Sequence, residues 1–164
     1  MLGKLLVIWS AILSMCLPGC KSEGYLPDIS RISYTSDSGT ILPELQWHEE
    51  IVITKGRVSL SRNGRTPDTK VNAGSWDFPV DEARVAALFD QLKAVDVPAI
   101  KRIEPEVQPD GGDSESFIIL YARDGKLTLD YGQGATYTND ALLVEPIRAF
   151  LKSLNLPPQA AARY

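Results

Sequence analysis

The sequence predicts an α+β fold in which an antiparallel sheet of four to five strands packs against two helices. Two stretches of alternating apolar residues flank short turns, and two others carry apolar residues at helical spacing. They follow one another as hairpin, helix, hairpin, helix, so a hairpin-helix unit is repeated along the chain. The two helices supply apolar stripes that can cover the apolar face of the sheet. The pattern fits a true duplication and a coincidence equally well.

The first predicted hairpin follows a strand-like run that begins at residue 29 and closes at Asp37-Ser38-Gly39. Residues 50–54 and 57–62 are rich in Val and Ile and flank Lys55-Gly56, which predicts two paired strands. The polar residues 63–74 read as a loop. Trp76 and Phe78 lie beyond this loop, where they can add a further short strand.

The first predicted helix covers residues 81–94. Asp81 is a favourable N-cap, and Val80 can pack on Val85 as a hydrophobic staple. The apolar residues at helical spacing are Val85, Leu88, Phe89 and Leu92.

The second hairpin and helix follow an irregular stretch, residues 97–113, that is rich in Pro and Gly. Residues 116–122 and 126–131 flank Asp124-Gly125, a strong signal for a tight hairpin turn. The second helix is predicted over residues 144–154, which places Pro146 in the first turn, where its missing N–H costs nothing.

The first residues of the chain have the pattern of an export signal. Lys4 precedes an apolar run, residues 5–17, that is shorter than the roughly 20 residues needed to span a bilayer. The run ends in Leu17-Pro18-Gly19-Cys20, which resembles the lipobox of bacterial lipoproteins. This resemblance implies cleavage between Gly19 and Cys20 and attachment of lipid to Cys20. Cys16 is a rival, but Met15 before it is large for the small-residue position.

The lipobox resemblance divides the chain into a signal peptide (1–19), a lipidated tether (20–28), one folded α+β domain (29–156) and a flexible tail (157–164). Several acyl chains on one cysteine give stable membrane anchoring. Lys21 and Ser22 follow the cysteine without an aspartate, which in the enterobacterial pattern implies the outer membrane, with the domain facing the periplasm. The alternative is an exported soluble protein in which Cys20 is unmodified.

The composition argues against nucleic-acid binding, because the chain carries a net charge of −4 and has no basic stripe. It also argues against an enzyme. His48 is the single histidine, and no serine lies in a Gly-x-Ser-x-Gly turn. The loop at residues 132–134 has Tyr137 where a dinucleotide-binding loop needs its third glycine, so we expect a flexible loop and no cofactor.

An acidic segment around Gly111-Gly112 is the preferred contact surface for a protein partner, because long loops in compact domains are often functional. Its spacing does not fit a calcium-binding EF-hand loop, so no metal is expected. Tyr137 is added as an aromatic residue that fits an interface and the core equally well. The predicted partner-binding residues are Glu104, Glu106, Asp110, Asp113, Glu115 and Tyr137.

The second half, from Asp113 through Phe117, the hairpin and the last helix, resembles the emfourin type of small metalloprotease inhibitor in layout. Emfourin proteins often have a Ser-Gly-Gly turn, whereas here Ser38-Gly39 is followed by Thr40. This resemblance implies an inhibitory role. The acidic long loop on a domain without catalytic groups predicts a non-catalytic module of the cell envelope that binds a secreted or envelope protein, as an inhibitor or an immunity factor. The alternatives are a structural envelope component and a hydrolase that uses carboxylates such as Asp113 and Glu115.

Overall fold

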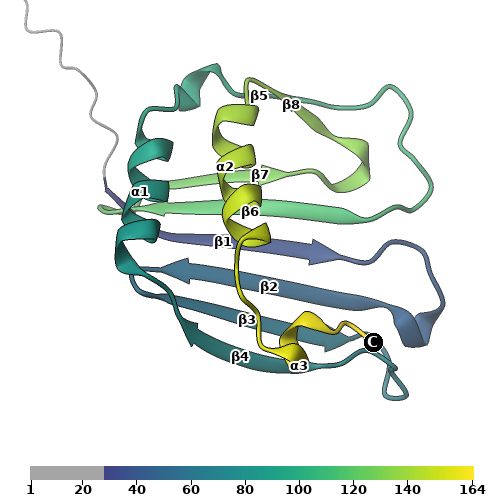
Figure 1. Ribbon diagram of the computed structural model, residues 1–164. Coiled ribbons are helices and arrows are strands. Elements are labelled where there is room, and N and C mark those ends of the chain that lie inside the picture. The colour runs from purple at the N-terminus through teal and green to yellow at the C-terminus, as the bar shows by residue number, and fades with distance from the viewer. Residues whose placement is uncertain (1–27) are drawn as a thin grey trace, which may run out of the picture.

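The computed structural model describes residues 28–164, so the predicted signal peptide, Gly19 and Cys20 lie outside the described part of the chain. Six antiparallel strands form one sheet in the order β4-β3-β2-β1-β6-β7 (Figure 1). The strands are β1 (Ile29–Asp37), β2 (Trp47–Thr54), β3 (Arg57–Gly64), β4 (Gly74–Pro79), β6 (Ser114–Tyr121) and β7 (Lys126–Asp130). A second, two-stranded sheet pairs β5 (Lys101–Ile103) with β8 (Thr136–Thr138).

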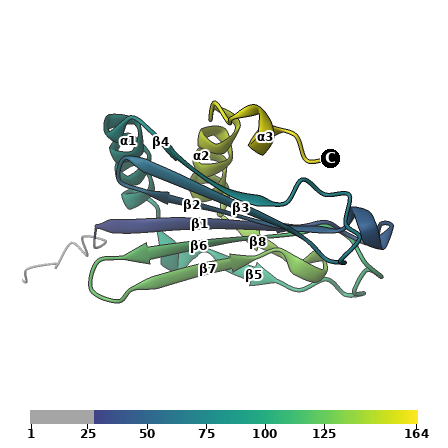
Figure 2. The same cartoon turned by 90° about the horizontal axis from the view of Figure 1, so that it is seen from below.

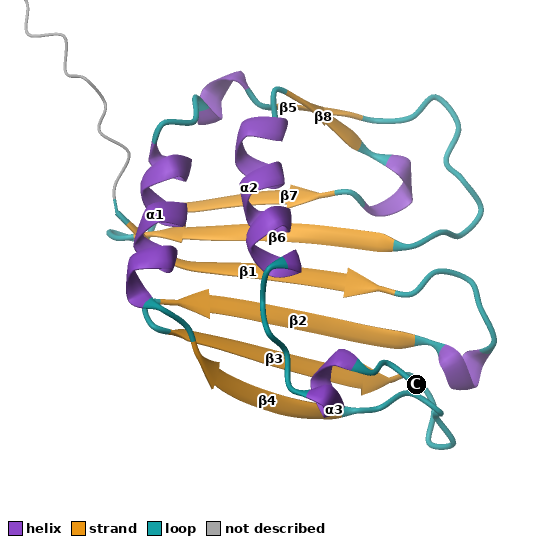
Figure 3. Ribbon diagram, in the orientation of Figure 1, coloured by secondary structure: helices purple, strands orange, loops and turns teal. Residues whose placement is uncertain are grey.

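The helical elements are shown with the strands in Figure 3. They are α1 (Glu82–Lys93), α2 (Ala141–Lys152), the short α3 (Pro158–Ala161), and the single 3-10 turns η1 (Pro43–Leu45), η2 (Val97–Ala99) and η3 (Gly132–Gly134). The predicted α+β class, both hairpins and both long helices are confirmed. The prediction of four to five strands is wrong, because the main sheet has six.

The strand count differs because β1 and β4 both join the main sheet. β1 lies at its centre, where Ile32 is opposite both Ile53 of β2 and Ile119 of β6. β4 pairs with β3 along its length and forms one edge. A local pattern predicts a strand but does not say which sheet the strand joins.

The core lies between one face of the sheet and the helices α1 and α2, which both cover that face (Figure 2). The strands alternate buried and less buried residues, so each strand gives one row of side chains to this core. The opposite face of the sheet carries small hydroxyl residues: Ser33, Thr35, Ser59, Ser61, Ser116 and Thr128. Among the described residues, the first buried apolar residue is Ile29 and the last is Ala160.

Helix α1 agrees with its prediction, and the Asp81 side chain caps it by accepting a hydrogen bond from the N–H of Ala83. Helix α2 starts earlier than predicted, at Ala141, so Pro146 lies inside the helix and not in its first turn. Pro146 therefore removes an intrahelical bond to the carbonyl of Leu142. The packing of Leu143, Val144, Ile147 and Phe150 against the sheet holds the helix across this position.

The C-terminal segment differs most from its prediction. Residues 157–164, expected to be a flexible tail, form α3 and lie on the helix-covered side of the sheet (Figure 2). Ala160 is fully buried there. The segment is folded because Arg62 of β3 binds its backbone carbonyls, a contact that sequence pattern alone does not show. The folded domain therefore extends beyond residue 156.

Candidate functional site

Three loops meet at the end of the sheet opposite the end where β1 begins (Figure 1). We call this end the distal loop edge; it consists of residues 38–46 between β1 and β2, residues 104–113 between β5 and β6, and the turn η3. The N–H of Gly39 donates to the Asp113 carboxylate at 2.6 Å, which ties the first loop to the second. A Cβ on Gly39 would lie 2.6 Å from the carbonyl carbon of Gly112, so this close approach requires glycine.

The predicted acidic residues do not form one cluster. Glu104 pairs with Arg102 at 2.5 Å, and Glu115 pairs with Arg148 of α2. Asp113 is occupied by its bond to Gly39. The remaining two, Glu106 and Asp110, lie on the exposed loop and form no ion pair within residues 28–164. The acidic surface that a partner can reach is therefore smaller than the sequence predicts.

Tyr137 is held within the fold. Its hydroxyl accepts hydrogen bonds from the N–H of Asp130 at 2.9 Å and from Arg102 at 3.2 Å. Its ring packs edge-on against Tyr131, with 5.1 Å between the ring centroids. Tyr137 belongs to β8, and its hydroxyl and ring tie the small sheet to the end of β7.

Exposed apolar side chains accompany the free acids on the distal loop edge. Val107 is 82 % exposed and Leu42 is 61 % exposed. Ile41, beside Leu42, is also exposed. Sequence analysis missed these three residues because isolated apolar residues in loops carry no periodic pattern. Apolar side chains beside polar ones on a surface are typical of sites that bind proteins.

A polar cavity of about 580 Å³ is lined in part by the loop that carries Val107. Its lining includes Arg102, Gln108, Pro109, Ser114, Asp130 and Gln133. Gln133 has a positive φ of 58° within η3, and the predicted flexible loop at residues 132–134 is therefore a defined turn. The Arg102 guanidinium is already bonded to Glu104, to the carbonyl of Asp130 and to Tyr137.

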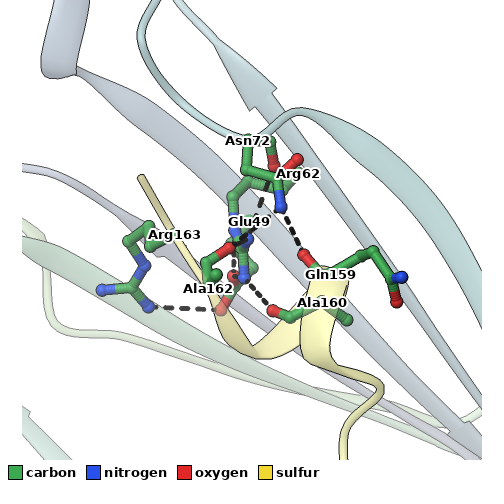
Figure 4. Close-up of polar contacts among 7 residues, drawn as sticks. All are labelled: Glu49, Arg62, Asn72, Gln159, Ala160, Ala162 and Arg163. Carbon is green, nitrogen blue, oxygen red and sulfur yellow. Dashed lines mark hydrogen bonds and ion pairs between the residues drawn. The ribbon is translucent and has the colours of Figure 1, made fainter.

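A buried polar centre joins the C-terminal segment to the sheet (Figure 4). Arg62 and Glu49 are 2 % and 5 % exposed, and the Arg62 Nε and Nη2 atoms lie 2.7 and 2.6 Å from Glu49 Oε2. Arg62 also donates to the carbonyls of Asn72, Ala160 and Ala162. Four hydrogen bonds and the ion pair with Glu49 thus surround the buried guanidinium, so its charge has partners on each nitrogen. Sequence analysis missed this pair, because each residue alone resembles an ordinary charged strand residue.

His48, the single histidine, lies at the start of β2 on the face of the sheet that the helices do not cover. Its Nδ1 atom is 3.0 Å from Asp37 Oδ1, and Arg65 lies 2.5 Å from the same oxygen. The residue is half-exposed, and its contact with Asp37 anchors the end of β1 to β2.

No protein-family model, curated protein or solved structure matches this chain. Among the described residues, no helix is both long enough and apolar enough to cross a bilayer. The same residues contain no group of three or more acidic, histidine or cysteine side chains placed to hold a metal ion. The resemblances to the lipobox and to emfourin stay predictions.

Proposed function

We propose that this protein is a lipid-anchored lipoprotein of the cell envelope that binds another protein through the distal loop edge and catalyses no reaction. The observation that carries the proposal is the exposure of Val107, Leu42 and Ile41 on the same edge of the sheet as Glu106 and Asp110, acids that form no ion pair within residues 28–164. These side chains contribute nothing to the core. Their exposure is a cost that binding to a partner would remove.

The position of the distal loop edge fits a protein held by its N-terminus. The folded domain starts at Ile29, and β1 runs from there to the distal loop edge over 9 residues. At roughly 3.3 Å per residue, this strand spans about 30 Å. With lipid on Cys20, the distal loop edge would face away from the outer membrane and into the periplasm, where an envelope or secreted protein could reach it.

An inhibitor or immunity factor is the kind of binding module that we favour. Such proteins need a rigid loop surface, and here the loops are tied together by the bond from Gly39 to Asp113 and by the close approach of Gly111 to Thr40. The alternative of a carboxylate hydrolase has less support. Asp113 and Glu115 bond to different partners, Gly39 and Arg148, within the fold.

The lipid anchor is tested in bacteria by metabolic labelling with a palmitate analogue. We expect label on the native chain, cleavage before Cys20, and loss of both in the Cys20→Ser variant. An unmodified thiol in the mass of the native product, or a Cys20→Ser protein that stays in the membrane fraction, would show that the anchor is wrong.

The binding surface is tested with the protein from residue 21 onward, which retains all the buried apolar residues described. The immobilised protein is used to capture partners from solubilised envelopes and from secreted proteins. We expect a captured protein that is lost with Val107→Asp and retained with Leu142→Asp. Leu142 is the matched control because it is 73 % exposed at the start of α2, where an acidic residue suits the helix dipole. Equal capture by both variants would refute the proposed surface.

A further inference from the structure

We propose that a groove beside α2 binds a small organic anion that has an apolar body, such as a medium-chain carboxylic acid. This α2 groove has a volume of about 450 Å³ and is separate from the distal loop edge. Its lining residues are Tyr34, Glu49, Ile51, Glu115, Arg148, Leu151 and Lys152. Its volume falls in the range of sites that hold small molecules. The proposal goes beyond the proposed function and does not depend on it.

The α2 groove is formed by rigid parts of the fold. Strands β1, β2 and β6 provide its floor, and the C-terminal half of α2 provides one wall. Arg148 is fixed by its ion pairs to Glu115 and Glu145 and by its position over the Phe117 ring, 5.6 Å from the centroid. Glu49 is held in place by its ion pair with Arg62. A ligand would therefore meet side chains that are already in place, which lowers the entropic cost of binding.

The charges around the α2 groove favour an anion. Its two carboxylates are each neutralised by an arginine, Glu49 by Arg62 and Glu115 by Arg148. Lys152 is exposed at the wall and forms no ion pair within residues 28–164. Arg163 adds a further cation 3.5 Å from Glu49. With Glu145, which also pairs with Arg148, these groups are four cations against three carboxylates, so Lys152 is the cation that is left for a ligand.

Two of the residues that line the α2 groove, Tyr34 and Arg148, have a raised pKa. Burial raises the pKa of Tyr34 above its ordinary value, and the nearby Glu115 carboxylate acts in the same direction. The Tyr34 hydroxyl lies close to the Glu115 carboxylate, so a ligand anion would compete with Glu115 for its proton. Partial burial acts against the charge of Arg148, but its bonds to Glu115 and Glu145 raise its pKa, so the guanidinium stays charged.

The rest of the lining suits the apolar body of the ligand. Ile51 is buried in the floor, Leu151 is partly buried in the wall, and the Tyr34 ring packs on Phe117 with 5.1 Å between the ring centroids. An inorganic anion would leave this apolar surface in contact with water. A molecule with a carboxylate head and a short hydrocarbon body would cover it and reach Lys152 as well.

The test uses octanoate as the probe with the protein from residue 21 onward, followed by calorimetry and by NMR shifts of assigned amides. We expect octanoate to bind and to shift the amides of Tyr34, Leu151 and Lys152. Acetate has the head without the body, and octanol has the body without the charge, so each should bind at least about threefold more weakly. Acetate binding as tightly as octanoate would reduce the α2 groove to a general anion site and would overturn the proposal.

Two variants test which positive charge binds the carboxylate of octanoate. Lys152→Gln should weaken octanoate binding by about threefold to fivefold, the usual worth of one exposed ion pair. Lys126→Gln is the matched control, because Lys126 is an exposed lysine on β7 outside the α2 groove, and it should leave binding unchanged. Equal losses in both variants, or no binding of octanoate at about 1 mM, would refute the site. Val107→Asp should bind octanoate normally, which separates this result from the test of the distal loop edge.

Discussion

The C-terminal segment and the loop of residues 104–113 lie toward the same end of the sheet but use their polar groups in opposite ways (Figure 1). Arg62 and Glu49, beneath the C-terminal segment, are buried and fully bonded to each other and to backbone carbonyls. Glu106 and Asp110, on the loop, are exposed and form no ion pair within the described residues. The comparison shows that Glu106 and Asp110, which stand out in the sequence, form no ion pair that supports the fold, whereas the inconspicuous pair of Arg62 and Glu49 does.

The largest effect should come from Arg62→Leu. This change leaves the buried Glu49 with only Arg163, 3.5 Å away, and leaves the carbonyls of Ala160 and Ala162 without their donor. We expect the free energy of unfolding in urea to fall by about 3–5 kcal/mol, the usual result of removing one partner of a buried pair. The double variant Arg62→Leu, Glu49→Leu should recover part of this loss. If the single variant lost under about 1 kcal/mol, the buried pair would not be the centre that holds the C-terminal segment.

An intermediate effect on stability is expected at acidic pH for Asp37. This carboxylate is partly buried and forms ion pairs with His48 and Arg65. Partial burial acts in the opposite direction, but hydrogen bonds from His48 and Arg65 lower the pKa of Asp37 below its ordinary value. Because the folded value is the lower one, this stabilisation is present above the unfolded pKa of about 3.9 and is lost as the pH falls through the folded value.

The Asp37→Asn variant should therefore lose up to about 1 kcal/mol at neutral pH and show a flatter decline in stability below about pH 4. Urea unfolding of both proteins from about pH 7 to about pH 2 measures this difference. Asp110→Asn is the control, because it removes a loop carboxylate that forms no ion pair among the described residues. Parallel pH curves for Asp37→Asn and the native protein would contradict the role given to Asp37.

The smallest effect on stability is expected for Val107→Asp on the exposed loop. Its side chain is 82 % exposed, so the change should alter the free energy of unfolding by no more than about 0.5 kcal/mol. Thermal unfolding followed by circular dichroism measures this. A loss above about 2 kcal/mol would mean that the loop supports the fold and would remove the contrast with the C-terminal segment.

The sequence predicts those parts of the fold that depend on near neighbours. The turn at Lys55-Gly56, the cap at Asp81 and the spacing of Val85, Leu88, Phe89 and Leu92 each specify one element, and each is present. The second hairpin is present too, but its positive φ angles fall at Arg123 and Asp124, one residue before the predicted turn. The pairing of β1 with β6 joins residues as far apart in sequence as Thr35 and Ser116. No local pattern encodes such a contact, and the central place of β1 could not be foreseen.

In the candidate sites too, features that depend on sequence neighbours are predictable, and contacts that depend on the tertiary fold are not. The acidic loop was visible as a run of charges, but the ties of Asp113 to Gly39 and of Glu115 to Arg148 depend on the tertiary fold. The C-terminal segment looked flexible because Pro157-Pro158 and the alanines that follow have no apolar periodicity. It is folded because a buried arginine on a distant strand needs its carbonyls.

The central position of β1 also determines how the molecule would respond to tension. β1 is the first strand of the domain and is hydrogen-bonded to β2 on one side and to β6 on the other. A pull on residue 28 acts along β1, so it loads both ladders in shear and stretches many hydrogen bonds at once. An edge strand pulled perpendicular to its length would instead lose its hydrogen bonds one after another. Under the proposed lipid anchor, mechanical load would enter the domain at β1, the strand best placed to resist it.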